Sequence, residues 1–396
     1  MTLRRIEVAQ RRIRLGRRHG LAAQTRAVGP AEVADRVVAL HGTDPASVYL
    51  SAIARLRTPD VGAVERALYD DRTLVRMLGM RRTMFVVGRN LAPVVQASCS
   101  RGIAAVQRRR LLSFMTQTHP SRDPQAWLAE AEEAVVRALA ARGEATAAQL
   151  SADDPRLAER LVLGAGTHSE ASASVASRVL LLLGVDGRIV RGRPGGSWTS
   201  SQYRWSLVDT WLPGGMPAQP TEAAQVVLVR RWLAAFGPGT APDLKWWTGW
   251  TVREVKRALA AIRPVEVDLD GEPGLVLADD QDPDPPATEP WAALLPALDP
   301  TVMGWAGPGR AWFLGGHGPA LFDRSGNAGP TVWWDGRVVG GWAQRGDGEI
   351  VLRLLEDVGD DAVAAVKAEV ERLAAAIGPV VVIPRFRTPL ERELII

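Results

Sequence analysis

The sequence predicts an α+β fold, with three tandem winged helix-turn-helix modules followed by a β-rich C-terminal cap. The first observation is an internal repeat: residues 143–150 (Gly-Glu-Ala-Thr-Ala-Ala-Gln-Leu) return as residues 237–244 (Gly-Pro-Gly-Thr-Ala-Pro-Asp-Leu). In both copies a glycine can end one helix, a threonine can cap the next and a leucine can anchor it, as in a helix-turn-helix. The second observation is that another helical run and a hairpin-like alternation follow each copy, as in a winged helix. The third is that short strand patterns dominate after residue 290.

Residues 1–120 predict a basic N-terminal segment and the first, least regular module. Pro30 can open its first helix, and Asp44 with Pro45 can cap and open the second. Thr58 or Asp60 can cap the third. The predicted elements are helices over residues 31–40, 45–56 and 61–69, a strand over 80–87 and a helical connector over 90–115.

Residues 121–215 predict the second module and residues 216–290 the third. In the second module we expect helices over 124–141, after Thr146 and over 169–183, then strands over 188–193 and 197–207 that turn at Pro194-Gly195-Gly196. In the third we expect helices over 221–236, after Thr240 and over 251–262, then strands over 265–269 and 274–277 that turn at Asp270-Gly271. Residues 279–290 are acidic and proline-rich, which predicts a linker.

Residues 291–396 form the predicted C-terminal domain. Its expected elements are strands over 311–314, 331–334, 337–344 and 349–355, a helix over 361–375 and a last strand over 380–383.

Composition excludes several classes of protein. A single cysteine, Cys99, excludes an internal disulfide and a cysteine zinc cluster, and the five histidines show no metal-ligand spacing with acids, so we expect neither metal nor cofactor. The sequence has no Walker loop, no dinucleotide fingerprint and no Gly-x-Ser-x-Gly elbow. Arginines interrupt every apolar run near the start, and no apolar stretch reaches about 18 residues, which predicts a cytoplasmic protein without a signal peptide or membrane span.

Charge is strongly segregated along the chain. Residues 1–125 hold 22 arginines, no lysine and nine acidic residues, a balance of +13, whereas the rest holds 26 basic and 35 acidic residues, a balance of −9. A high-GC genome would explain why only three lysines occur, but it does not explain the segregation. The charge and the repeat together predict a nucleic acid as the partner, contacted mainly by the N-terminal third.

Three blocks of sequence resemble those of a known family. They are Leu40-His41-Gly42-Thr43-Asp44-Pro45 with Val48-Tyr49-Leu50-Ser51 and Arg55-Leu56, then Leu294-Leu295-Pro296-Ala297-Leu298-Asp299-Pro300, then Val332-Trp333-Trp334-Asp335-Gly336-Arg337-Val338-Val339-Gly340-Gly341-Trp342. In this order they resemble the AlkZ-like and YcaQ-like winged-helix DNA glycosylases, from about residue 30 to about residue 390.

The resemblance implies a DNA repair glycosylase that hydrolyses the N-glycosidic bond of alkylated purines, N7-type and also bulky or crosslinked, in duplex DNA. We expect a monofunctional enzyme, because no lysine lies near the candidate site to form a Schiff base and the nearest in sequence is Lys245. We also expect a monomer, because three tandem modules in one chain suit one-sided wrapping of a duplex.

The resemblance also implies catalytic residues at His41, Thr43 and Asp44. The chain departs from the family here, since studied members carry Gln-x-Gln or Gln-x-Asp where this sequence has His-Gly-Thr. We expect His41 to orient or deprotonate a water, because an unperturbed imidazole pKa of about 6.5 suits a base at neutral pH. Thr43 can hold that water, and Asp44 can supply a negative charge.

Each of these residues also has a plain structural interpretation. His41 can be a hydrogen-bonded structural histidine, Asp44 a helix cap and Thr43 a solvated turn residue. The departure from the family motif also leaves open a DNA-binding protein without chemistry, such as a regulator or a lesion- or drug-sensing factor. A monomer favours the glycosylase, because regulators built on single modules normally dimerise on half-sites.

Eight further residues are predicted to contact DNA. Arg191 and Arg193 flank the predicted hairpin tip, and Trp198 lies just beyond it. The other five are basic residues at the expected first wing strand or on the third module's recognition helix. An unpartnered solvated face is the alternative for the basic residues, and core packing is the alternative for the tryptophans. The set comprises Arg81, Arg82, Arg191, Arg193, Trp198, Arg253, Lys256 and Arg257.

Overall fold

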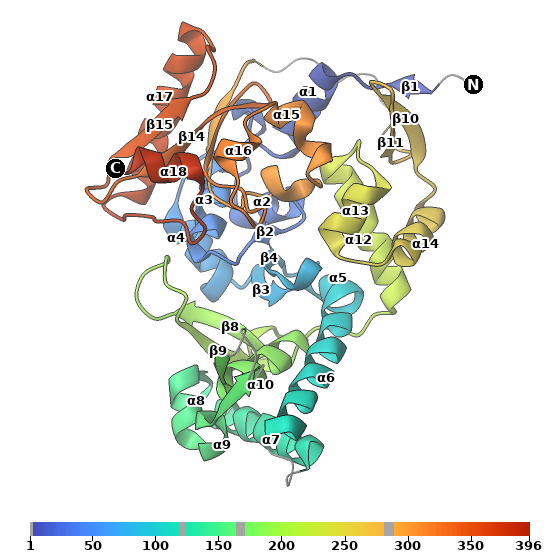
Figure 1. Ribbon diagram of the computed structural model, residues 1–396, viewed down its shortest axis with the longest axis vertical. Coiled ribbons are helices and arrows are strands. Elements are labelled where there is room, and N and C mark those ends of the chain that lie inside the picture. The colour runs from blue at the N-terminus through green and yellow to red at the C-terminus, as the bar shows by residue number, and fades with distance from the viewer. Residues whose placement is uncertain (1–2, 119–122, 164–170, 281–288) are drawn as a thin grey trace.

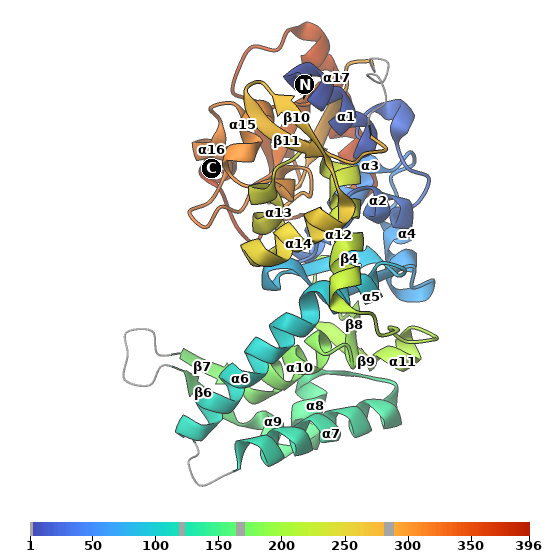
Figure 2. The same ribbon diagram turned by 90° about the vertical axis from the view of Figure 1, so that its right-hand side faces the viewer.

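The computed structural model describes residues 3–118, 123–163, 171–280 and 289–396, and it shows an α+β protein. Two views show an upper lobe, which holds both termini, and a lower lobe built from the middle of the chain (Figures 1 and 2). One large apolar core joins residues from Leu15 to Cys99 with parts of the chain after Val190, up to Leu394. A second core, from Leu111 to Trp205, fills the lower lobe.

The N-terminal region packs its helices on a small sheet of order β2-β4-β3. Its elements are β1 (Arg4–Arg5), α1 (Val8–Arg18), α2 (Pro30–Arg36), β2 (Leu40–His41), α3 (Pro45–Arg55), α4 (Val61–Glu65), β3 (Leu74–Leu78), the turn η3 (Met80–Arg82) and β4 (Met84–Gly88). The predicted helix over 31–40 is wrong at its end, because Val38 takes a left-handed φ of 64° and the chain then pairs as β2 with β4. The predicted strand over 80–87 begins only at Met84, and β3 was not predicted.

The lower lobe follows a long helical connector, as expected. Its elements are α5 (Ala92–Val95), α6 (Arg101–Thr118), α7 (Pro124–Arg142), β5 (Glu144–Thr146), α8 (Ala147–Asp153), α9 (Pro155–Ala158), β6 (Arg160–Leu163), β7 (Ala171–Ser174), α10 (Val175–Val185), β8 (Ile189–Pro194), β9 (Tyr203–Leu207) and α11 (Val208–Trp211). The helix predicted over 169–183 begins only at Val175, where Ser174 caps it; residues 169 and 170 lie outside the described part. The strand predicted over 197–207 begins only at Tyr203.

The region from residue 216 matches its prediction closely. It contains α12 (Thr221–Phe236), α13 (Ala241–Thr248), α14 (Val252–Ile262), β10 (Val265–Leu269) and β11 (Glu272–Val276). The strand β1 adds to this hairpin in parallel beside β10, which was not predicted. The linker predicted over 279–290 lies mostly outside the described residues.

The C-terminal region is a four-stranded antiparallel sheet of order β12-β13-β14-β15 with helices beside it. Its elements are β12 (Ala292–Leu295), α15 (Ala311–Leu314), α16 (Gly318–Leu321), β13 (Thr331–Trp334), β14 (Arg337–Gln344), β15 (Ile350–Leu354), α17 (Asp360–Ile377) and α18 (Pro389–Leu394). The strand predicted over 311–314 is wrong, since these residues form α15. The strand predicted over 380–383 is also wrong, because this stretch has no ladder partner in the described sheet.

One topology occurs three times. Each copy has a helix, a short extended segment, further helices and a hairpin, and the short segment pairs with the second hairpin strand. The first and third copies have two further helices, whereas the second has three, with the strand pair β6–β7 between α9 and α10. The pairs are β2 with β4, β5 with β9, and a single bridge from Gly239 to Leu275 of β11. The next helix is capped by Asp44, Thr146 and Thr240 respectively, and both threonine caps form capping boxes. The His-Gly-Thr-Asp segment therefore occupies the same place in its copy as the two repeated segments do in theirs.

Candidate active site and nucleic-acid interface

A cavity of about 420 Å³ lies where the loop after β2 meets the lower lobe. Gly42 and Thr43 line it from the first copy of the topology, and Thr146 lines it from the second. The hairpin β8–β9 and the segment before α18 complete its walls. Its lining is Gly42, Thr43, Pro45, Thr146, Ala147, Ala148, Arg191, Ser201, Gln202, Tyr203, Trp205 and Arg385.

Backbone pairing and one arginine fix the loop that carries Thr43. The Gly42 N–H donates to the Met84 carbonyl at 2.7 Å, and Arg76 Nη1 donates to the Gly42 carbonyl at 2.9 Å. A Cβ on residue 42 would lie 3.0 Å from Arg76 Nη1 and 3.4 Å from the Met84 oxygen. A side chain at position 42 would therefore be tightly packed and would require Arg76 to shift. Thr43 is half-buried, and its hydroxyl has no hydrogen-bond partner among the described residues.

His41 lies behind this loop and does not line the cavity. Its side chain is 6% exposed and meets Phe85 edge-to-face, with 5.2 Å between the ring centroids. The Nδ1 atom is buried without a hydrogen-bond partner. Burial, and then the charge of Arg81, lowers the pKa of His41 to about 3. The expectation of a base with an ordinary pKa near 6.5 is therefore wrong, because the imidazole is neutral and weakly basic at pH 7.

Asp44 is a helix cap, as its structural interpretation predicted. Its Oδ1 accepts from the Ala46 N–H at 3.2 Å and caps α3, and its Oδ2 accepts from the Arg385 N–H at 3.0 Å. Burial raises the pKa of this carboxyl. Both oxygens are engaged and neither faces the cavity, so Asp44 holds the segment that brings Arg385 to the cavity wall.

Arg76 and Tyr203 are site residues that the sequence did not reveal. Arg76 is 3% exposed, forms no ion pair with any described acid, and leaves Nε and Nη2 buried without partners. Its guanidinium lies 5.0 Å from the Tyr203 ring centroid, and that of Arg191 lies 5.5 Å from the same ring. Burial, and then Arg76, lowers the pKa of Arg191 to about 10, so Arg191 stays charged at neutral pH. Since no described acidic side chain lines the cavity, its field is positive.

The tip of the β8–β9 hairpin docks on the N-terminal region instead of projecting freely. Trp198 is 7% exposed and packs against Tyr49 at 5.1 Å, so its predicted place in the DNA interface is wrong. Arg193 pairs with Asp70 at 2.8 Å and lies 5.0 Å above the Tyr69 ring. Its charge is therefore already balanced within the protein.

Arg81 and Arg82 occupy η3 and point apart. Both have left-handed φ angles, 52° and 58°. Arg81 stacks on Trp246 at 3.9 Å, and Arg310 lies 4.8 Å from the same ring. Burial lowers the pKa of each of these two arginines to about 10. Arg82 is exposed and faces a separate pocket beside α6.

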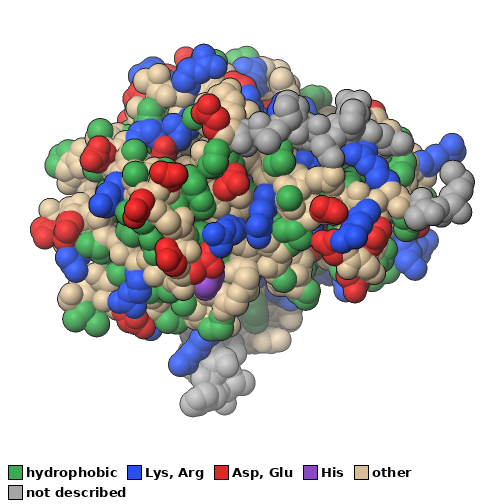
Figure 3. Space-filling view, turned by 90° about the horizontal axis from the view of Figure 1, so that it is seen from above, with side chains coloured by type: hydrophobic (Ala, Val, Ile, Leu, Met, Phe, Trp, Pro, Cys, Tyr) green, Lys and Arg blue, Asp and Glu red, His purple; other side chains and the backbone are tan. Residues whose placement is uncertain are grey.

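The basic face of α14 is only partly free. Arg253 and Lys256 are exposed and have no described acidic partner, whereas Arg257 pairs with Glu222 at 2.8 Å and donates to Gln225 at 2.7 Å. The top of the molecule, over α1, α15 and α17, carries acidic and basic side chains in a mixture (Figure 3). That face therefore shows no single-sign patch for a polyanion.

The described residues contain no group of three His, Cys, Asp or Glu side chains that could hold a metal ion. In the same part of the chain no helix is long and apolar enough to cross a membrane.

Comparisons with known proteins identify the family of this chain. The family model described as DNA glycosylase AlkZ-like matches residues 34–376. Among solved structures, Streptomyces sahachiroi DNA glycosylase AlkZ is similar in fold, with a TM-score of 0.70 and 20% sequence identity over 96% of this chain and 98% of that one. No curated protein gives a significant match. Because the family model spans most of its length, the chain belongs to the AlkZ-like family of DNA glycosylases.

Proposed function

We propose that this protein is a monofunctional DNA glycosylase that hydrolyses the N-glycosidic bond of N7-alkylated purines, bulky or crosslinked ones included, in duplex DNA. The observation that carries the proposal is the position of His41-Gly42-Thr43. By the sequence resemblance, this segment stands where studied members of the family carry Gln-x-Gln or Gln-x-Asp, and it opens, through Gly42 and Thr43, onto the positive cavity of about 420 Å³.

Hydrolysis of an N7-alkylated purine needs little acid catalysis. An N7-alkylated purine is cationic and leaves with the electron pair of its C1′–N9 bond, while a water oxygen bonds to C1′ and loses a proton to solvent. In this proposal the Thr43 hydroxyl, which is half-buried and has no partner among the described residues, holds that water. Neutral His41 adds no positive charge behind the developing oxocarbenium ion. We assign His41 to orientation of the Thr43 loop and Asp44 to its anchoring.

The arginines around the cavity bind the DNA strand in this proposal. Arg191 and Arg385 line the wall, and the pKa of Arg191, about 10, leaves that side chain charged at neutral pH. Both arginines suit the phosphates that flank the lesion. Those phosphates in turn offset the positive field that would otherwise oppose the cationic sugar. Arg81, Arg82, Arg253 and Lys256 supply further phosphate contacts. Arg193 and Arg257 are weaker candidates, because internal acids already balance them.

We further propose that the three copies of the shared topology are winged helices in residues 1–120, 121–215 and 216–290, followed by a C-terminal domain over 291–396. Their common order of elements and the three equivalent caps support this division. Three modules in one chain suit one-sided wrapping of a duplex by a monomer. A monofunctional mechanism is favoured because none of the lysines 245, 256 and 367 lines the cavity, so no described amine can form a Schiff base there.

Release of base from a duplex with a single N7-methylguanine tests the proposal. Wild type should produce an abasic site at that position, and none in the unmodified duplex. His41→Ala should reduce the rate and leave the binding of DNA intact. Salt-sensitive binding without any release, from this lesion and from a bulkier N7 adduct, would overturn it.

The second candidate is a non-catalytic DNA-binding protein. The neutral, weakly basic state of His41 and the lack of a described carboxylate in the cavity favour it. It predicts a tight dimer and no base release, whereas the glycosylase predicts a monomeric mass. Sedimentation of the full chain with the release assay separates the two.

A further inference from the structure

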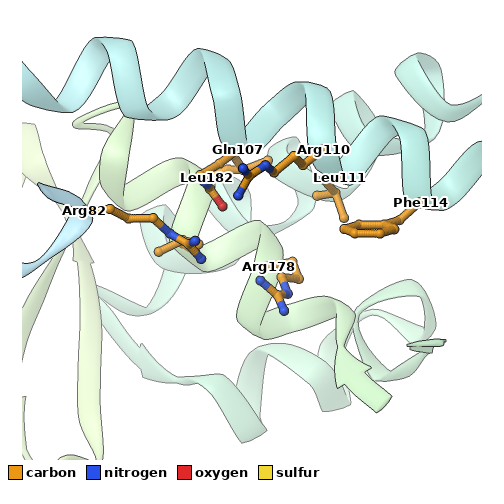
Figure 4. Close-up of a pocket in the computed structure, with 8 residues that line it drawn as sticks. Arg82, Gln107, Arg110, Leu111, Phe114, Arg178 and Leu182 are labelled. Atoms are coloured by element: carbon orange, nitrogen blue, oxygen red, sulfur yellow. The ribbon is translucent and has the colours of Figure 1, made fainter. Parts of the chain in front are cut away.

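A second pocket, of about 350 Å³, lies between α6 and α10 in the lower lobe (Figure 4). Arg82 enters it from η3, Arg110 from α6 and Arg178 from α10. The close-up shows these three side chains pointing into the space between the two helices. Three elements far apart in sequence therefore bring three guanidinium groups together.

The charge of these arginines is not balanced within the described protein. No described acidic side chain lines the pocket, and none of the three forms an ion pair with a described acid. The neighbouring Arg108 behaves differently, since it pairs with Glu132 at 2.7 Å and with Asp186 at 2.6 Å. Burial, and then the charges of Arg178 and Arg110, lowers the pKa of Arg82. The three cations repel one another, and a bound anion would remove that repulsion.

The walls suit a phosphate that carries a sugar. Gln107 is 7% exposed and adds an amide beside the arginines. Leu111, Leu181 and Leu182 form an apolar side, which lowers the local dielectric and strengthens each charged hydrogen bond. A volume of about 350 Å³ is larger than one phosphate needs and falls in the range of small-ligand sites.

A third, smaller hollow connects the pocket to the candidate active site. A narrow hollow between them shares Leu181 with the pocket and shares Arg191 with the Thr43 cavity. The pocket and the Thr43 cavity are therefore connected through residues that line the hollow between them.

We propose that the pocket of Arg82, Gln107, Arg110 and Arg178 binds a sugar-phosphate unit of the DNA strand, away from the lesion. This rests on the proposed DNA substrate but not on the hydrolysis. A free nucleotide has the same chemistry, and the test below separates the two sources. Each arginine acts as a phosphate contact, so each contributes to the salt dependence of binding.

The test is the affinity of the full-length protein for a 20-base-pair duplex, measured by fluorescence anisotropy between 50 and 200 mM salt. The variants are Arg110→Gln, Arg178→Gln and their combination, with Arg109→Gln as the matched control. Arg109 is exposed on the same helix and does not line the pocket. The slope of log Kd against log salt should fall by about 0.9 for each pocket arginine removed. A fourfold rise in salt should thus weaken DNA binding by the double variant about tenfold less than it weakens DNA binding by wild type. Arg109→Gln should lower the salt slope much less.

Calorimetry with adenosine monophosphate and with inorganic phosphate supplies the second arm. If the double variant loses nucleotide binding but keeps the wild-type salt slope for DNA, the pocket binds a free nucleotide, and the proposal that it binds the DNA strand is overturned. Pocket variants that match Arg109→Gln in both arms would overturn the proposal. A protein that binds DNA through this pocket but releases no base would refute the glycosylase and leave the pocket standing.

Discussion

The ion pair between Arg55 and Asp299 ties α3, the helix that begins at the candidate site, to the C-terminal region. Its two side chains are 1% and 0% exposed. Arg55 Nη1 and Nη2 donate to the two Asp299 oxygens at 2.8 and 2.6 Å. Asp299 also accepts from the Ser51 hydroxyl at 2.8 Å and from the Thr301 N–H at 2.9 Å. This network gives a physical reason for the Leu-Asp-Pro end of the second family block.

Removal of the carboxylate should be costly. Asp299→Ala leaves the Arg55 charge buried without an acid and deprives Ser51 and Thr301 of their acceptor. Breaking a buried pair in this way typically costs about 3–5 kcal/mol of unfolding free energy. A natural domain has a total of about 5–15 kcal/mol, so the variant should be close to unfolding in the upper lobe. Glu133→Ala is the control, because its i,i+4 pair with Arg137 is 66–68% exposed and should contribute less than about 1 kcal/mol.

Urea unfolding followed by tryptophan fluorescence and by circular dichroism measures both variants. Arg55→Met/Asp299→Leu should recover much of the loss, because two apolar residues leave no buried charge behind. If Asp299→Ala costs less than about 1 kcal/mol, or no more than Glu133→Ala does, the pair does not hold the regions together as described.

Three further predictions concern the site and the caps. The folded pKa of His41, about 3, lies below its unfolded value of about 6.5, so stability should be lost as pH falls from 6.5 towards 3. His41→Asn should remove up to about 1.4 kcal/mol of that loss in unfolding free energy per pH unit. The effect is measured as the difference from wild type, so that the opposing contribution of Glu391, whose pKa burial raises to about 7, cancels. Parallel curves of unfolding free energy against pH would contradict the buried neutral state of His41. Gly42→Ala should lower base release at least tenfold and cost about 1–3 kcal/mol in urea unfolding, because its Cβ would crowd Arg76, and wild-type release would refute that crowding. Thr240→Ala should cost about 1 kcal/mol through loss of its cap on α13, whereas Thr240→Ser should not; equal effects would deny the cap.

Local signals in the sequence predicted the parts of the fold that local chemistry decides. The Thr146 and Thr240 caps, the Asp44-Pro45 start of α3 and the Asp270-Gly271 turn all occur where they were expected. The predicted strand at 311–314 failed, because a continuous run of four apolar residues fits one helical turn as well as a short strand. The single bridge at Gly239 and the two-residue β2 are too short to leave a pattern.

The candidate site was only half predictable. The family resemblance marked residues 41–44, and Thr43 does line a cavity. The roles of Arg76, Tyr203 and Arg385 depend on the meeting of three distant segments, which no spacing along the chain reveals. His41 fails as an ordinary base for the same reason, since its pKa is set by burial and by Arg81 and not by its sequence neighbours. The tightly packed Trp198 likewise depends on a tertiary contact with Tyr49.

Single-turnover release of N7-methylguanine from a duplex, compared among wild type, Thr43→Ala and Thr43→Ser, tests the central claim most directly. The account predicts that Thr43→Ala slows release by about a hundredfold, because the water loses its hydroxyl partner, while Thr43→Ser stays within about tenfold of wild type. All three should bind the duplex alike. Release by Thr43→Ala at the wild-type rate, with wild type active, would show that bond hydrolysis does not take place at this cavity.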